Sequence, residues 1–233
     1  MQLLPCLLLL STTLALPSLH AAIVISDSSM THALWTSSKV SDRSSPSTAA
    51  SGTYTASASG RTDVRQISHT FGIAEPTRSD VVSSHLFEGS SYSPFSSGTI
   101  ESLDFTLDLI NTFGGTSGGV AAGVAVRQAG QLYLSTSSSV VFTGSGWQSL
   151  AFNDLDALDF RATDLSNPDF STSGAPLHFG FFLSNGSSLN VSTGTTSFAD
   201  NFEVAITSIP EPSHIALFLG TFVLVGAVWR RTK

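Results

Sequence analysis

One short segment has the residue types needed for nucleophilic catalysis. Residues 115–119, Gly-Thr-Ser-Gly-Gly, match the G-x-S-x-G pattern of a nucleophile elbow, in which a strained turn between a strand and a helix exposes the serine, here Ser117. Residues 120–126 alternate as a strand does, and neither His69 nor His85 has the surroundings of a catalytic base. We therefore expect Ser117 to be a loop residue and the protein not to be an enzyme.

A run of carboxylates offers oxygen ligands for calcium. It comprises Asp154, Asp156, Asp159, Asp164 and Asp169. Calcium takes roughly six to eight oxygen ligands, but the glycine and the glutamate of the EF-hand pattern are missing from this run. Two interpretations stay open: a solvated acidic turn between strands, which we favour, and a structural calcium site. No other cofactor is expected.

Other kinds of site have weaker support. The chain has no paired carboxylates arranged for glycoside hydrolysis, and its six histidines are not spaced for zinc. A net charge of −7 opposes nucleic-acid binding, which requires a basic surface. Four aromatic residues could stack on a sugar ring if they were exposed: Trp35, Tyr92, Tyr133 and Trp147. Trp147 begins an apolar stretch, so we expect it to pack in the core.

The elements that position these residues have a period of two. Apolar side chains alternate with polar or small ones over residues 103–109, 120–126, 177–183 and 202–206, which predicts strands with one face in a core and the other toward solvent. Shorter candidate strands are 65–73, 81–87, 131–136, 140–143 and 147–152. Ala129-Gly130 and Asn185-Gly186 have the composition of hairpin turns, and Gly194 also separates candidate strands.

This pattern predicts an all-β fold, an antiparallel jelly-roll-like β-sandwich, over residues 61–209. Residues 23–60 are rich in serine and threonine, and they either form edge strands, at 23–25 and 53–57, or are flexible. Only 12% of the chain is charged, and hydroxyl side chains fill many polar positions, which is typical of exported β proteins.

The N-terminus is typical of a secretory signal peptide. An apolar run over residues 3–16 is followed by small residues that end in Ala21 and Ala22, so we expect residues 1–22 to be removed on export. Cys6 is the only cysteine and lies inside this segment. The mature chain would then form no disulfide.

The C-terminus has three ordered elements. Pro210, Glu211 and Pro212 form a break that no helix interior accommodates. An uncharged apolar segment follows at residues 215–229 and predicts a single transmembrane helix, about 22 Å long at 1.5 Å per residue, compared with a hydrocarbon core of about 30 Å. Three cations close the chain, Arg230, Arg231 and Lys233, and the positive-inside rule places them in the cytoplasm.

Residues 210–233 resemble the PEP-CTERM sorting domain of Gram-negative bacteria that also make exopolysaccharide. The resemblance implies that Pro210, Glu211 and Pro212 are recognised by an exosortase, a membrane processing enzyme that removes the helix. It also implies that residues 215–229 are a transient anchor in the lipid bilayer, and that Arg230, Arg231 and Lys233 are retention charges. Residues 147–206 resemble the jelly-roll bodies that often precede this tail, and concanavalin-like and galactose-binding-like folds both fit.

We expect a non-catalytic exported protein, anchored in the membrane by one C-terminal helix and then located at the cell surface or in the extracellular matrix. The alternative is a carbohydrate-binding β-sandwich module that recognises extracellular polysaccharide. A secreted hydrolase ranks third. Two or three exposed aromatic residues on one sheet face would favour the carbohydrate-binding alternative over the first interpretation.

Overall fold

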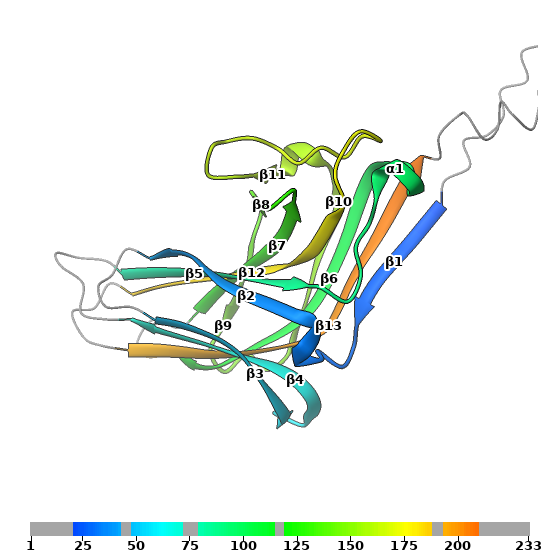
Figure 1. Cartoon of the computed structure of the whole chain (residues 1–233). Helices are drawn as coiled ribbons and strands as arrows, with labels where there is room; N and C mark the ends of the chain where they lie inside the picture. The colour runs from blue at the N-terminus through cyan, green and yellow to red at the C-terminus, as the bar shows by residue number, and fades with distance from the viewer. Residues whose placement is uncertain (1–20, 43–47, 72–78, 115–118, 188–192, 210–233) are drawn as a thin grey trace, which may run out of the picture.

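The computed structural model describes residues 21–42, 48–71, 79–114, 119–187 and 193–209 (Figure 1). Several predictions fall outside these residues: most of the signal peptide, Ser117, the sorting residues Pro210, Glu211 and Pro212, the apolar segment 215–229, and the charges Arg230, Arg231 and Lys233. Within the described residues, no helix has the length and hydropathy needed to cross a bilayer.

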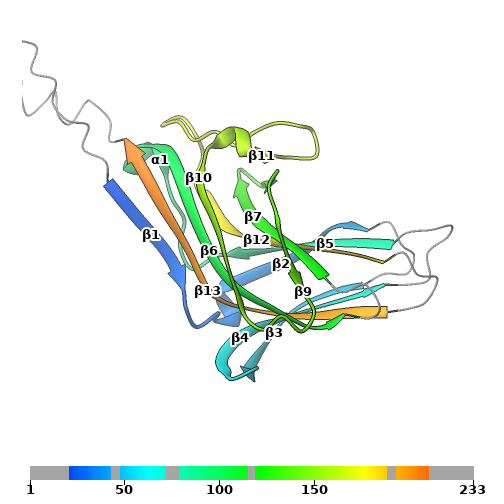
Figure 2. The same ribbon diagram turned by 180° about the vertical axis from the view of Figure 1, so that it is seen from behind.

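The described chain folds as two antiparallel β-sheets packed face to face, so the all-β sandwich predicted from the sequence is confirmed (Figures 1 and 2). Sheet A has the strand order β10-β6-β13-β4-β3, and β1 also pairs with β13. Its six strands within the described residues are β1 (Ala21–Asp27), β3 (Thr48–Ala58), β4 (Arg61–Phe71), β6 (Thr99–Gly114), β10 (Gln148–Leu155) and β13 (Thr193–Ile209).

Sheet B has the strand order β11-β8-β7-β12-β5-β2, and β9 pairs with β7. Its seven strands in the described part of the chain are β2 (Trp35–Asp42), β5 (Ser79–Phe87), β7 (Gly119–Gln128), β8 (Gln131–Ser135), β9 (Ser139–Phe142), β11 (Phe160–Arg161) and β12 (Leu177–Ser187). Within the described ranges, three single-turn helices connect strands: η1 (His32–Leu34), α1 (Pro94–Ser97) and η2 (Ala157–Asp159).

The core lies between the two sheets and follows the predicted alternation. On β6, Leu103, Phe105, Leu107 and Leu109 are buried, whereas Asp104 and Thr106 are exposed. At the centre of the core Trp35 packs against the ring of Phe202, with ring centroids 4.9 Å apart. Aromatic pairs of this kind bury large apolar areas and stabilise the packing of the sheets.

The alternation fails at the centre of sheet B. On β7 the predicted core positions are buried, but the intervening Gly123 and Ala125 are buried as well. On β12 the same holds for Gly180 and Phe182, which lie between core positions. The outer face of sheet B is therefore partly hidden from solvent, because the sheet curves and its margins approach each other over the middle strands.

Two turn predictions have opposite outcomes. Ala129-Gly130 joins β7 to β8 as a two-residue hairpin with φ of 50° and 83°, and Gln128 pairs with Gln131, as predicted. The prediction of a turn at Asn185-Gly186 is wrong, because both residues lie inside β12 and pair with Val81 and Asp80. A hydrogen bond from the core, described below, holds the Asn185 side chain inside the sandwich.

β13 is one strand of 17 residues where the sequence predicts shorter pieces. Gly194 pairs with Thr70 inside this strand and does not form a break. A bulge after Asp200 leaves Asn201 with a φ of 50° and lets pairing resume at Glu203. The bulge keeps the strand continuous and turns Asn201 toward the outer face of sheet A.

Candidate functional site

The carboxylates of the predicted acidic run make local hydrogen bonds to backbone N–H groups and to serine residues. The Asp156 carboxylate accepts a hydrogen bond from the backbone N–H of Leu158, and Asp159 accepts one from the N–H of Asp156, so both cap η2. Asp164 and Asp169 accept bonds from Ser166 and Ser171 in the same local manner. Among the described residues no three metal-binding side chains gather, and these carboxylates therefore act as turn and helix caps.

A buried polar network joins the two sheets, and sequence reasoning missed it. His69 on β4 shares one hydrogen bond, 2.6 Å, with Asn185 Oδ1 on β12 and another, 2.7 Å, with Ser83 Oγ on β5. Ser83 Oγ also lies 2.9 Å from the Nε2 atom of His85. The order Ser–His–Asn resembles a nucleophile with its base and orienting group. Ser83 is only 1% exposed, however, so no substrate reaches its oxygen.

The network continues to a buried arginine. Ser37 Oγ lies 2.8 Å from the Nδ1 atom of His85 and accepts a hydrogen bond from Arg65 Nη2 at 2.6 Å. Burial lowers the pKa of Arg65 to about 10, although the charge of Asp27 raises it. Burial also lowers the pKa of His69 to about 4 and that of His85 well below its usual value. Both imidazoles are therefore neutral at pH 7, and the network is structural.

Three of the four aromatic candidates are buried. Trp35 and Tyr92 are 6% and 2% exposed, and each donates a hydrogen bond inside the protein, to Asp27 Oδ2 and to the carbonyl of Gly98. Tyr133 is 8% exposed. These three residues pack in the core and present no ring to a ligand.

The prediction that Trp147 packs in the core is wrong. It lies just before β10, after the turn that contains Gly144 and Gly146, and it is half-buried. The Arg61 guanidinium lies over its ring, 4.2 Å from the centroid. The buried positions of β10 begin at Leu150, after Trp147.

The outer face of sheet A carries a group of polar residues, here called the Asp108 cluster: Arg61, Asp108, Ser149, Asp200 and Asn201. Asp108 accepts hydrogen bonds from Arg61 Nη1 at 2.6 Å, from Asn201 Nδ2 at 2.8 Å and from the hydroxyl of Ser149. Asp200 accepts from the same Arg61 nitrogen at 3.0 Å. Burial raises the pKa of Asp108, but these hydrogen bonds outweigh it and the pKa is lowered.

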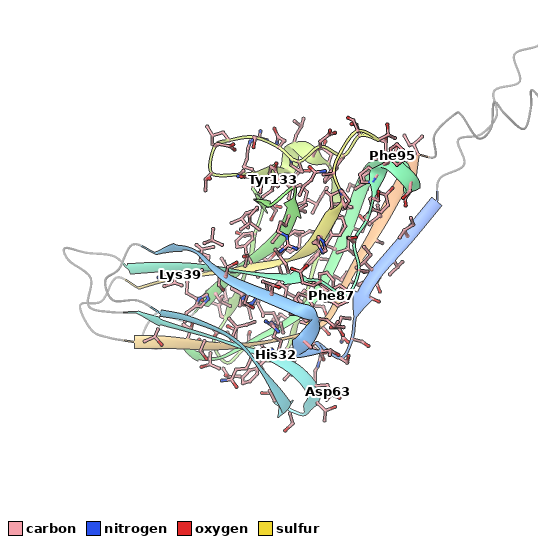
Figure 3. The ribbon with its side chains drawn as sticks, in the orientation of Figure 1. His32, Lys39, Asp63, Phe87, Phe95 and Tyr133 are labelled. Atoms are coloured by element: carbon pink, nitrogen blue, oxygen red, sulfur yellow. The ribbon has the colours of Figure 1, made fainter. Side chains whose placement is uncertain are left out.

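The outer face of sheet B contains a hollow of about 500 Å³, here called the groove. Residues from both margins of the sheet line it: Val40, Val82, Gln131, Leu132, Leu134, Arg161, Ala162 and Thr163. Lys39 on β2 and Tyr133 on β8, labelled in Figure 3, mark the strands that border it on opposite sides. A hollow lined by both margins shows that the sheet curls around this face.

The floor beneath the groove, formed by β7 and β12, combines small residues with the large ring of Phe182. Ala125 pairs with Gly180, so in this row β7 and β12 carry only a methyl group and a hydrogen atom. In the next row the ring of Phe182 lies against Gly123, where a Cβ atom would come within 2.6 Å of Phe182 Cζ. The residues that line the groove come from β2, β5, β8, β11 and the two positions after β11.

Charged residues close one end of this face. Arg127 Nη2 donates to Glu88 Oε2 at 2.7 Å, and His178 Nδ1 lies 3.1 Å from the same oxygen. Burial raises the pKa of Glu88, but the hydrogen bond and the charge of Arg127 outweigh it and the pKa is lowered. Glu88 is therefore ionised at neutral pH, and the pair gives the groove a polar end next to its apolar middle.

No protein-family model matches the chain, and no curated protein matches it. Among solved structures, it is similar to a family 11 carbohydrate-binding module from Clostridium thermocellum in complex with a β-1,3-1,4-mixed-linked tetrasaccharide, at 10% identity over 82% of this chain and 98% of that one, with a TM-score of 0.43. A family 22 xylan-binding domain from Paenibacillus barcinonensis matches at 12% identity over the same shares, with a TM-score of 0.41. A family 27 module that recognises mannan has 11% identity over 80% and 98%, with a TM-score of 0.37. Similarity at this level does not identify a ligand for this chain.

Proposed function

We propose that this protein is an exported, non-catalytic carbohydrate-binding protein with a jelly-roll-like body, and that the groove on sheet B holds one segment of an extracellular polysaccharide. The observation that carries the proposal is the groove itself, a concave surface lined from both margins of one sheet. Ligand sites are typically concave and mostly apolar, with a few polar groups that fix orientation.

The chemistry of the groove suits a neutral sugar chain. Leu132 and Leu134 on one margin face Val40 and Val82 on the other, and these aliphatic surfaces can cover the apolar C–H faces of pyranose rings. Hydroxyl groups of the sugar then need hydrogen-bond partners at the rim, which Gln131, Arg161 and Thr163 supply. Arg161 is the one charged residue of the lining, and the net charge of the chain is −7, so a neutral polymer fits better than an acidic one.

The groove lacks the aromatic cluster that would mark a stacking site. Among described residues on this face, Phe142 on β9 is 63% exposed and Phe182 is 8% exposed. Contacts with sugar would therefore be mainly aliphatic, with weaker binding than an aromatic platform gives. The small number of exposed aromatic residues among those described on this face favours a second candidate function, that of a matrix protein retained without a sugar ligand.

Affinity gel electrophoresis of the full-length protein tests the proposal. The protein is solubilised in a polyoxyethylene detergent, because a glucoside or maltoside head group would compete for a sugar site. Separate gels contain soluble mixed-linkage β-glucan, xylan, mannan or alginate. We expect at least one neutral polymer to retard the protein and alginate to have little effect. No retardation in any gel would favour the matrix protein without a ligand.

We also propose that export and sorting use the two ends of the chain. A signal peptide at residues 1–22 would direct export, and residues 210–233 would act as the sorting tail, with the bilayer holding residues 215–229 until an exosortase acts at Pro210, Glu211 and Pro212. The support is the order of these elements in the sequence. Deletion of residues 210–233 should move the protein from the membrane fraction to the soluble exported fraction. Unchanged fractionation would contradict the tail.

A further inference from the structure

One corner of the sandwich presents apolar side chains to solvent. Phe95 on α1 is 80% exposed, Ile209 at the end of β13 is 42% exposed, and Val24 on β1 is 55% exposed. Figure 3 shows Phe95 beside the end of β13, at the tip of the molecule. We call Phe95 and Ile209 the apolar corner.

The backbone pairing places the segment that holds Phe95 beside Ile209, whereas Val24 pairs with Ala205, four residues before Ile209. Thr99, at the start of β6, follows α1 closely and pairs with Ile209, and Ala21, at the start of β1, pairs with Ser208. The end of β13, the start of β1 and α1 therefore share one end of sheet A (Figures 1 and 2).

The segment that holds Phe95 is well ordered by its contacts. The Tyr92 hydroxyl donates to the carbonyl of Gly98 at 2.7 Å, and the Gly98 N–H donates to the carbonyl of Pro94 at 2.9 Å. Tyr92 also exchanges two backbone hydrogen bonds with Leu177, and Pro94 is buried. A fixed loop therefore holds Phe95 outward, and the exposure of its ring is a property of the fold.

The chain beyond Ile209 limits how far this corner lies from the predicted anchor. Only five residues, 210–214, separate Ile209 from the apolar segment 215–229. Even fully extended, at about 3.5 Å per residue, they span on the order of 20 Å. While the segment is in the bilayer, the corner is held close to the lipid surface at high effective concentration.

We propose that the apolar corner docks on the lipid surface next to the anchor, with Phe95 inserted among the lipid head groups. The inference rests on the proposed role of residues 215–229 as a membrane anchor. Residues 89–100 contain no charged side chain, so the contact would be apolar and not electrostatic. Docking would orient sheet A with this end on the membrane and leave the groove on sheet B accessible to polysaccharide.

The test uses the full-length protein in phosphatidylcholine vesicles. In a Cys6→Ser background, single cysteines at three positions carry an environment-sensitive fluorophore: Ser96→Cys beside Phe95, Leu224→Cys in the predicted anchor, and Thr62→Cys in the β3–β4 hairpin, which lies well away from α1 (Figure 1). Spin-labelled lipids then quench fluorophores that contact the bilayer. We expect strong quenching at positions 224 and 96, and weak quenching at position 62.

Replacing Phe95 provides the decisive comparison. Phe95→Ser should reduce quenching at position 96 severalfold and leave quenching at position 224 unchanged. High salt should have little effect at position 96, because no basic residue is involved. Two results would overturn the docking and leave the anchor intact. In the first, the fluorophore at position 224 is quenched but the one at position 96 is quenched no more than the one at position 62. In the second, Phe95→Ser does not change the quenching at position 96. Absence of quenching at 224 would overturn the anchor itself, and the docking with it.

Discussion

The outer faces of the two sheets differ in whether their side chains bind one another or expose apolar surface to water. On sheet A, Asp108 accepts three hydrogen bonds and Arg61 bridges it to Asp200, so the polar groups there pair mainly with each other. On sheet B, Leu132, Leu134, Val40 and Val82 border a groove in which apolar surface faces water. The first face contributes to stability of the fold, whereas the second can gain free energy by covering its apolar surface with a ligand.

Substitution of a floor glycine should have the largest effect. A Cβ at Gly180 would overlap the backbone carbonyl of His85 on the neighbouring strand, so Gly180→Ala should force β12 and β5 apart and cost at least about 3 kcal/mol. On sheet A, a Cβ at Gly194 would lie 3.1 Å from the carbonyl of His69, and Gly194→Ala should cost about 1 kcal/mol. Thermal unfolding of both variants measures this difference. Equal effects would contradict a tighter floor in sheet B.

Acid should lower the free energy of unfolding through the buried histidine network that joins the two sheets. The pKa of His69 is lowered to about 4 by burial, so the folded state binds fewer protons than the unfolded state, whose histidine titrates near 6.5. Stability is therefore lost as pH falls from about 6.5 toward 4, with a loss on the order of 2 to 3 kcal/mol from His69 by pH 4.5.

Histidine variants isolate this contribution. His69→Gln should flatten the decline in Tm between pH 7 and 4.5, whereas His32→Gln, at an exposed position, should leave the decline unchanged. His85 is also neutral and buried, so some decline should remain in His69→Gln. A pH profile identical in all three proteins would show that the buried imidazoles do not titrate with unfolding.

A charge in the groove should reduce sugar binding, and the same change on sheet A should not. Val82→Asp places a carboxylate in the groove, and we expect affinity for the retarding polysaccharide to fall at least about tenfold, or 1.4 kcal/mol. Val24→Asp makes the same substitution on β1, where Val24 is 55% exposed, and should bind as the unchanged protein does. Thermal melts of both confirm folding. Similar losses in both variants would contradict a site on sheet B.

A substitution in the Asp108 cluster should lower stability and leave polysaccharide binding unchanged. Asp108→Asn removes the charge that Arg61 and Asn201 contact, and we expect a loss of about 1 kcal/mol in unfolding free energy, because the cluster is partly exposed. Polysaccharide binding should not change. Reduced binding with unchanged stability would move the site to sheet A.

Removal of the rim cation should have the smallest effect. Arg161 is exposed on β11 at the edge of the groove, and Arg161→Ala should weaken binding about threefold, or roughly 0.6 kcal/mol, through one lost hydrogen bond. Leu158→Ser on η2, with Leu158 67% exposed, is a control for surface changes close by in the chain. A larger loss from Leu158→Ser than from Arg161→Ala would contradict the assigned rim.

Local sequence pattern predicts the strands but not the curvature of the sheet. Strict alternation over residues 103–109 corresponds to β6, because a strand in a sandwich turns every second side chain to the core. On β12, the same pattern cannot show that Gly180 and Phe182 are also buried, because this depends on strands β2 and β8 approaching across the sheet. The groove therefore cannot be predicted from local sequence pattern, although Gly123 and Gly180 inside strands indicate close packing.

The polar contacts are also hidden from sequence patterns. His69 and Asn185 are 116 residues apart in sequence and meet only because β4 and β12 belong to facing sheets. Asn185-Gly186 has the composition of a hairpin turn, but the hydrogen bond of Asn185 to His69 and the pairing of β12 with β5 outweigh local preference. Trp147 similarly stays outside because Arg61 and the turn before β10 position it.

The most direct test of a binding face on sheet B is hydroxyl-radical footprinting of the full-length protein with and without the polysaccharide that retards it most strongly. One experiment measures the modification of side chains on the outer faces of both sheets. Binding in the groove predicts reduced modification of Leu132, Leu134 and Val82, with Trp147 and Val24 on sheet A unchanged. Protection of Trp147 with no change at Leu132 and Leu134 would contradict the account.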